Sequence, residues 1–87
     1  MTKQGPGSVP EAISASLLRL GTSLDEQGMV QQALTPYLKL IERYPNSQEA
    51  SIAAEKVLVI AEGLRKMGQH HMAMTVLDRL ETAHQGR

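Results

Sequence analysis

The chain has 87 residues, with nine Lys and Arg against nine Asp and Glu, so its formal net charge is zero. A chain of this length forms one small domain, and zero net charge argues against nucleic acid as a partner because phosphate binding rests on clustered cationic side chains. The absence of cysteine excludes disulfides, and no apolar run approaches the roughly 20 residues of a membrane span. We therefore expect a soluble protein.

The first predicted element is a helix over about residues 9–27, after a Gly- and Pro-containing tail at residues 1–8 that we expect to be disordered. Ser8 and Glu11 have the spacing of a capping box, which marks the start of a helix. The apolar residues then recur every three or four positions: Val9, Ile13, Leu17, Leu20 and Leu24. This stripe predicts the face that packs into the core. Gly28 is expected to end the helix in a left-handed conformation.

Three more helices are predicted. They cover about residues 30–44, 47–67 and 70–84, before a frayed C-terminus at residues 85–87. Pro36 lies beyond the first turn of the second helix, so it removes one backbone hydrogen bond and predicts a bend. That bend is either a tolerated kink or a feature that shapes a binding face.

The start of the third helix has two candidate caps. Asn46 with Glu49 forms a capping box, and Ser47 is the alternative. No segment shows the strand pattern of alternating residues bounded by turns. The predicted fold is all-α, with four helices and antiparallel neighbours.

The chain also repeats itself at an offset of 40 residues. Six pairs of residues at this offset are identical: Leu18 and Leu58, Leu24 and Leu64, Gly28 and Gly68, Ala33 and Ala73, Thr35 and Thr75, and Leu40 and Leu80. A period of this size is typical of stacked helical hairpins. We predict one domain over residues 9–84, with repeat one at 9–45 and repeat two at 46–84.

The first copy resembles a tetratricopeptide repeat. The residues that carry the resemblance are Leu17, Leu20-Gly21, Leu24, Gly28, Ala33, Tyr37, Leu40 and Pro45. The second copy fits less fully, at Val57, Ile60-Ala61, Leu64, Gly68, Ala73, Leu77 and Leu80, with Gln85 in place of the closing proline. The resemblance implies two stacked hairpins in which Gly21, Ala33, Ala61 and Ala73 allow the helices to approach closely and Tyr37 fills the space beside them. The Tyr-Pro-Asn-Ser junction is similar to that of bacterial cell-envelope members. We expect a cytoplasmic protein, with a domain of a cell-envelope protein as the alternative.

Members of this family are interaction scaffolds, and the first helix of each hairpin supplies most of their concave surface. The resemblance places Ala15 and Arg19 on that surface, together with the residues that we predict to bind a protein or peptide partner: Leu18, Thr22, Asp25, Glu55, Leu58, Val59, Glu62 and Arg65. Some members bind a C-terminal carboxylate through a set of Lys and Asn residues, which here are Leu, Thr, Glu and Val. A carboxylate clamp is therefore not expected.

The apolar content of the third helix exceeds what one helix face can bury. Residues 57–61 are five consecutive apolar residues. Either the four helices form a fully packed bundle, or Leu18, Leu58 and Val59 contact another chain. We favour contact with another chain, most simply a symmetric homodimer, with a partner helix or peptide laid in the groove as the other form.

The sequence offers little for catalysis or metal binding. His70 and His71 point about 100° apart on a helix, and His84 lies too far along it to join them. No nucleophile–base arrangement is recognisable, so we expect no enzyme activity and no cofactor. We interpret Met67, Met72 and Met74 as filler of irregular gaps rather than a binding patch. The alternative function is an accessory subunit or domain of a larger enzyme or secretion complex.

Overall fold

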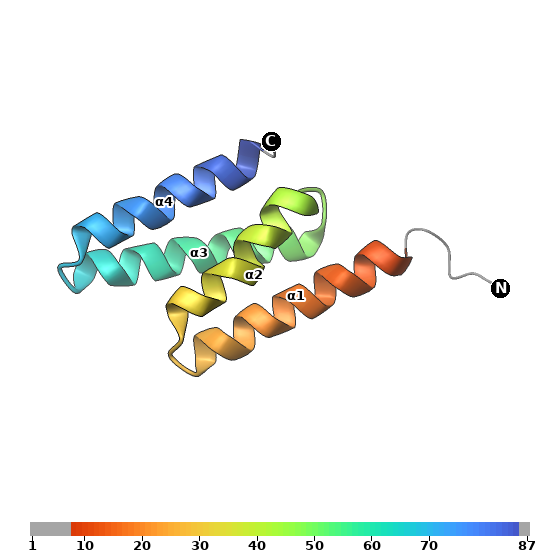
Figure 1. Cartoon of the computed structure of the whole chain (residues 1–87), viewed down its shortest axis with the longest axis horizontal. Coiled ribbons are helices and arrows are strands. Elements are labelled where there is room, and N and C mark those ends of the chain that lie inside the picture. The colour runs from red at the N-terminus through yellow and green to blue at the C-terminus, as the bar shows by residue number, and fades with distance from the viewer. Residues whose placement is uncertain (1–7, 86–87) are drawn as a thin grey trace.

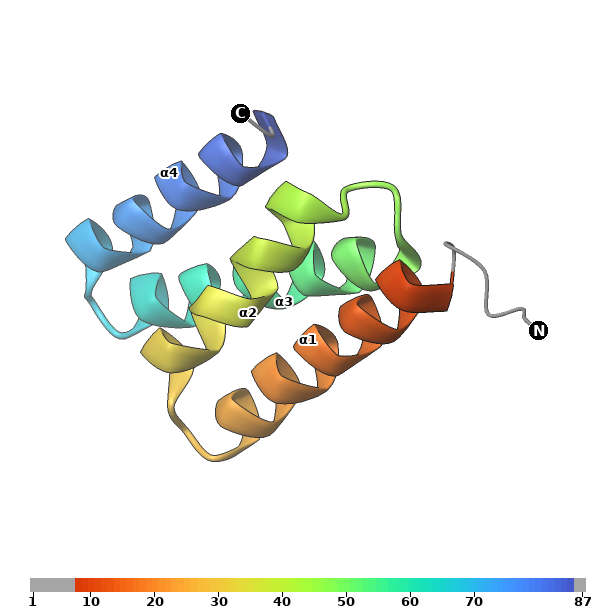
Figure 2. The ribbon, with the colours of Figure 1, turned by 45° about the vertical axis from the view of Figure 1, so that its right-hand side comes forward.

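A computed structural model describes residues 8–85 of the chain, with side chains from residue 12 onward. It contains four helices, α1 (Ser8–Glu26), α2 (Val30–Arg43), α3 (Gln48–Lys66) and α4 (His70–Gln85), and no strand in that range. The helices form two antiparallel hairpins, α1 with α2 and α3 with α4, and α1 and α3 run in the same direction (Figures 1 and 2). The predicted all-α fold is confirmed. The expected tail at 1–8 and frayed end at 85–87 differ from the structure at one residue each, because Ser8 begins α1 and Gln85 ends α4. Residues 1–7 and 86–87, and the side chains of the Ser8–Glu11 capping box, lie outside the described part of the chain.

Both hairpins turn through the same backbone motif. Gly28 and Gly68 have φ of 82° and 84°, a left-handed conformation that glycine adopts at little cost. In the first turn the Met29 amide donates to the Leu24 carbonyl at 2.9 Å and the Gly28 amide donates to the Asp25 carbonyl at 3.0 Å. The second turn has the same pair of hydrogen bonds 40 residues later. This is the Schellman motif, so the left-handed stop expected at Gly28 is confirmed, and Gly68 ends α3 in the same conformation.

The helix α2 lies at the centre of the fold. It contacts α1, α3 and α4, whereas α1 and α4 do not contact each other within the described residues. Its apolar residues cover a wide face that is buried among these neighbours: Ala33, Leu34, Tyr37, Leu38, Leu40 and Ile41. Residues of α3 and α4 complete the core: Ala50, Ala53, Val57, Ile60, Ala61, Leu64, Ala73, Val76, Leu80 and Ala83. Burying this apolar surface is the main favourable contribution to folding.

The junction between the hairpins is fixed by Ser47. Its hydroxyl accepts a hydrogen bond from the Ala50 amide at 3.1 Å and donates to the Tyr44 carbonyl at 2.7 Å. Of the two candidate caps of α3, Ser47 is the one that the structure uses. The helix α2 continues through the buried Pro36 and ends at Arg43, two residues before Pro45.

Small residues bring the helices together as expected. Gly21 is buried, and so are Ala33, Ala61 and Ala73. A methyl group built on Gly21 would lie 2.5 Å from Cε1 and 2.6 Å from Cδ1 of the Tyr37 ring. The ring of Tyr37 therefore occupies the space that the missing side chain leaves, and the predicted pairing of these two residues is confirmed.

The predicted buried face of α1 is partly wrong. Ile13 and Leu20 are exposed, and the positions that are buried instead are Ser14 and Gly21. Leu17 and Leu24 are half-buried against the core. The physical reason is the close approach of α2, because Tyr37 requires a position without a side chain and so turns the side of α1 that carries Gly21 inward.

Candidate functional site

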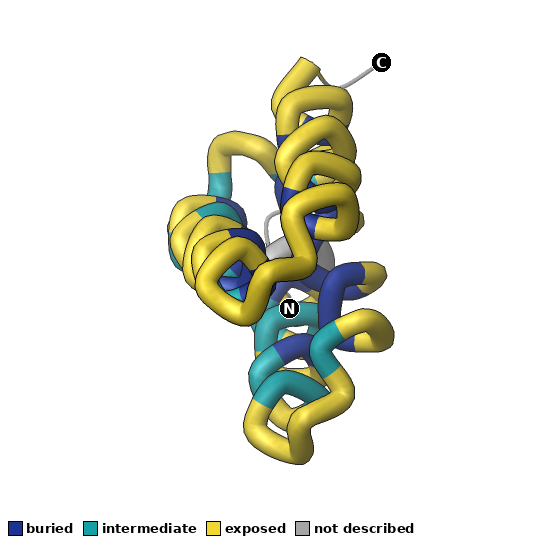
Figure 3. Tube along the Cα trace, turned by 90° about the vertical axis from the view of Figure 1, so that its left-hand side faces the viewer, coloured by how far each residue is buried: buried dark blue, intermediate teal, exposed yellow. Residues whose placement is uncertain are grey.

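An open groove of about 690 Å³ lies between α3 and α4. Its lining is mainly apolar, with polar groups near the turn that joins the two helices. The lining residues are Leu58, Val59, Ala61, Glu62, Gly63, Arg65, Lys66, His70, Ala73, Met74 and Leu77. Figure 3 shows that buried residues gather where helices face one another, while exposed residues follow the outer sides of the fold. The α3–α4 groove is thus an exposed surface on the second hairpin.

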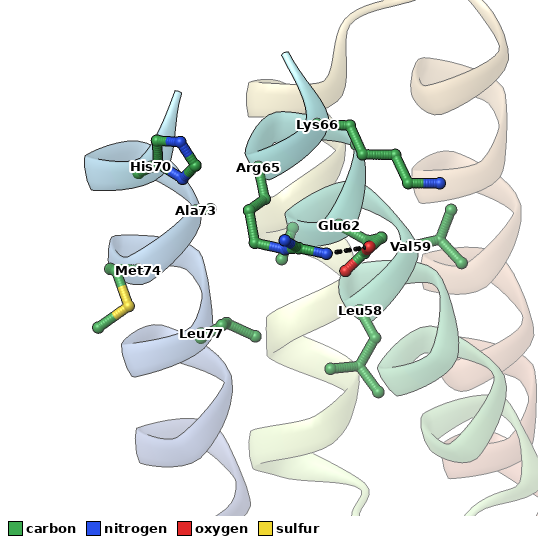
Figure 4. Close-up of a pocket in the computed structure, with 11 residues that line it drawn as sticks. Leu58, Val59, Glu62, Arg65, Lys66, His70, Ala73, Met74 and Leu77 are labelled. Atoms are coloured by element: carbon green, nitrogen blue, oxygen red, sulfur yellow. Dashed lines mark hydrogen bonds and ion pairs between the residues drawn. The ribbon is translucent and has the colours of Figure 1, made fainter. Parts of the chain in front are cut away.

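The apolar side chains of the groove are exposed on both of its walls. Leu58 is half exposed and Met74 more so. In Figure 4 the side chains of Leu58 and Leu77 point into the space between α3 and α4, while Val59 points to the other side of α3. Such clustered apolar side chains are typical of a surface that contacts another protein.

An ion pair lies at the polar end of the groove. The guanidinium of Arg65 donates to the carboxylate of Glu62 one helical turn away, and both side chains are exposed. This hydrogen bond lowers the pKa of Glu62 below its ordinary value, and the positive charge of Arg65 adds to the effect. Exposed pairs of this kind contribute little to stability, so we regard them as polar contacts at the edge of an apolar surface.

A second, smaller hollow of about 260 Å³ lies between α1 and α3. It is lined by Asp25, Ile52, Glu55, Lys56 and Val59. Three of these, Asp25, Glu55 and Val59, are among the predicted partner-binding residues. Val59 therefore lies between the two hollows and lines both of them.

The structure thus divides the eight predicted residues. The α3–α4 groove is lined by four of them, Leu58, Val59, Glu62 and Arg65. The hollow between α1 and α3 is lined by Asp25 and Glu55. The remaining two face inward in part. Leu18 is half-buried and packs against the core, and Thr22 is half-buried and forms a hydrogen bond with the side chain of Tyr37.

The hydroxyl of Tyr37 connects the core to the hollow between α1 and α3. It donates to Oδ2 of Asp25 at 3.5 Å, a long hydrogen bond. Burial raises the pKa of Tyr37 above its ordinary value, the hydrogen bond with Thr22 acts against this, and the negative charge of Asp25 adds to the rise. The neutral phenol is therefore the form that the folded protein stabilises.

This shift predicts a measurable titration. The chain has only two tyrosines, so a Tyr44→Phe variant reports Tyr37 alone through the ultraviolet absorbance of its phenolate. We expect a midpoint above the value of about 10 for free tyrosine. Because the pKa is raised by folding, the contribution of Tyr37 to stability is complete below about pH 10 and is lost as the pH rises further. A midpoint no higher in the folded variant than in the same variant in urea would contradict the assignment.

Sequence reasoning missed the wall of the groove that α4 provides. Leu77 is expected from the sequence only as part of the second repeat. The methionines are expected to fill irregular gaps, yet Met67, Met72 and Met74 are all exposed. The filler interpretation is wrong for these three methionines. The largest side chain in the described core is that of Tyr37. The repeat offset gave no signal for this wall, because Met74 and Leu77 correspond to Leu34 and Tyr37, which are buried on the second helix of the first hairpin.

Among residues 12–85, no three side chains of His, Asp or Glu lie close enough together to hold a metal ion. None of the four helices has both the length and the apolar character to cross a membrane.

Comparison with known proteins gave one family. The model of the tetratricopeptide repeat matches residues 15–47, which cover most of α1, all of α2 and the junction to α3. The matched segment contains the Gly21–Tyr37 contact and the first Schellman turn. No curated protein and no solved structure matched the chain.

Proposed function

We propose that this chain, which contains a tetratricopeptide repeat at residues 15–47, is a non-enzymatic protein-interaction module that associates with itself through exposed apolar side chains on α1 and α3. A repeat of this kind implies a module that binds proteins. The observation that supports self-association is the α3–α4 groove, where Leu58, Met74 and Leu77 are exposed together.

The driving force for association comes from the apolar area that these side chains expose. Transfer of apolar surface out of water is worth about 25 cal/mol per Å², so several half-exposed leucine and methionine side chains provide a driving force for association. Polar residues at the edge of the groove, Glu62 and Arg65, can select the partner without adding much affinity. The balanced charge of the chain places no strong repulsion between two copies.

Sedimentation velocity of the purified chain tests self-association. We expect the average sedimentation coefficient to rise with concentration, and Leu58→Glu to abolish this rise because the new carboxylate would be buried without a partner. Val59→Glu introduces the same charge on the other side of α3 and tests the hollow between α1 and α3.

The control for both variants is Met67→Glu, which adds the same charge at an exposed methionine outside the groove. It should behave like the unchanged chain. An unchanged chain that stays monomeric at high concentration would refute self-association. A different protein would then be the partner, as in the accessory-subunit alternative.

A further inference from the structure

The internal repeat indicates which kind of helix fits the α3–α4 groove. Each residue of the second hairpin has a counterpart 40 positions earlier in the first hairpin, and both hairpins have the same turn. The two hairpins differ in their surroundings, because the second packs on the first through contacts of α3 with α1 and α2 and of α4 with α2. Comparing exposure at matched positions therefore reveals which surfaces lack a neighbour.

One such surface is the groove itself. Leu34 is 1% exposed, whereas its counterpart Met74 is 58% exposed. Tyr37 is fully buried, whereas its counterpart Leu77 is exposed. Leu34 and Tyr37 lie on α2, which contacts α1, α3 and α4, whereas α4 contacts only α2 and α3 among the described helices. Figure 4 shows Leu77 pointing into the space between α3 and α4.

The other such surface is the outer side of α1. Ile60 of α3 is 7% exposed, whereas its counterpart Leu20 on α1 is 51% exposed. Ala53 is fully buried, whereas its counterpart Ile13 is exposed. These residues of α3 belong to the helix that docks on the first hairpin. The counterparts on α1 are apolar as well, and no described helix packs against them.

The outer side of α1 and the α3–α4 groove are therefore complementary, because they match the two surfaces that join the second hairpin to the first. We infer that a second copy of this chain docks with its α1 in the α3–α4 groove, in the position that α3 takes on the first hairpin. This inference rests on the proposed self-association and specifies its geometry. The occupant is a second copy because α1 carries exposed apolar residues, Ile13 and Leu20, at the positions where α3 has the buried Ala53 and Ile60.

This mode of association is head to tail. The surface given by one copy, α1, differs from the surface given by the other, the groove, so an open assembly keeps a free α1 surface at one end and a free groove at the other. Such an interface adds copies until a ring closes or continues as a filament. A symmetric homodimer, the form expected from the sequence, would stop at two copies.

Two single variants separate these geometries. Leu20→Glu blocks the α1 surface, and Met74→Glu blocks the groove; both side chains are more than half exposed, so neither change should disturb the fold. We expect the unchanged chain to grow beyond two copies with concentration in light scattering, and each variant alone to associate at least tenfold more weakly. An equimolar mixture of the two variants should form a complex of exactly one copy of each, because one retains the groove and the other retains α1.

Recovery in the mixture also shows that both variants are folded, and Met67→Glu should behave like the unchanged chain. Three results would overturn the inference. If the unchanged chain stops at a dimer that Leu20→Glu leaves intact, self-association stands and only its head-to-tail geometry fails. If both variants are folded by circular dichroism but do not combine when mixed, the head-to-tail geometry is again wrong, while self-association still stands. If the unchanged chain is monomeric throughout, the geometry and the proposed self-association fail together.

Discussion

Replacing Leu40 with alanine is expected to lower the free energy of unfolding by about 3 kcal/mol. Leu40 is 0% exposed on the central helix α2, and removing a buried leucine costs the transfer free energy of the lost groups plus the free energy of the cavity, about 2–5 kcal/mol. A domain of this size has a total stability at the low end of the usual range of about 5–15 kcal/mol. Leu40→Ala should therefore lower the melting temperature by at least about 10 °C.

Thermal and urea unfolding at a concentration where the chain is monomeric measure this effect. The control is Leu58→Ala, the same change at a half-exposed position of α3, which should cost less than about 1 kcal/mol because little apolar area is lost and no cavity forms. Equal losses for the two variants would contradict the position of Leu40 at the centre of the core.

Replacing Gly21 with alanine is the second large effect that we expect. A methyl group at this position meets the buried ring of Tyr37 at 2.5 Å, so the ring or the helix must move. Overpacking of this kind costs about 1–3 kcal/mol. The better helix propensity of alanine returns up to about 1 kcal/mol, so the net loss should be about 1–2 kcal/mol in the same unfolding experiments.

The chain contains a matched control for this change. Gly63 also lies within a helix, but a methyl group there would have nothing within 4 Å, so Gly63→Ala should raise stability by about 0.5–1 kcal/mol. Repeat two has Ala61 and Leu77 at the positions of Gly21 and Tyr37. In a Tyr37→Leu background, Gly21→Ala should therefore lose its cost, a coupling that a double-mutant cycle measures. An equal cost in both backgrounds would show that the ring is not the obstacle.

The sequence predicted the features of the fold that depend on local patterns. The four helices, the left-handed stops at Gly28 and Gly68 and the inward-facing small residues all follow from spacing, glycine conformation and the repeat. These signals are reliable because each one is imposed by the chain on itself: a turn that needs a positive φ needs glycine whatever surrounds it.

The sequence was less informative about which apolar residues are exposed. The stripe that contains Ile13 and Leu20 has the spacing of a core face, and periodicity cannot distinguish a face that packs in the same chain from one that awaits a partner. The same ambiguity hid Met74 and Leu77. Only the packed structure separates these residues, because their matched counterparts Ile60 and Leu34 are buried in it.

The contact between two copies can be located with a spin label on α1. Because the chain has no cysteine, Ser16→Cys on the exposed side of α1 gives a single site for a spin label, and the labelled copy can be mixed with an isotope-labelled, unmodified copy. We predict that the amide signals of the unmodified copy broaden along the α3–α4 groove, around Leu58 and Met74. Signals that do not broaden, or that broaden only along α1, would contradict the account.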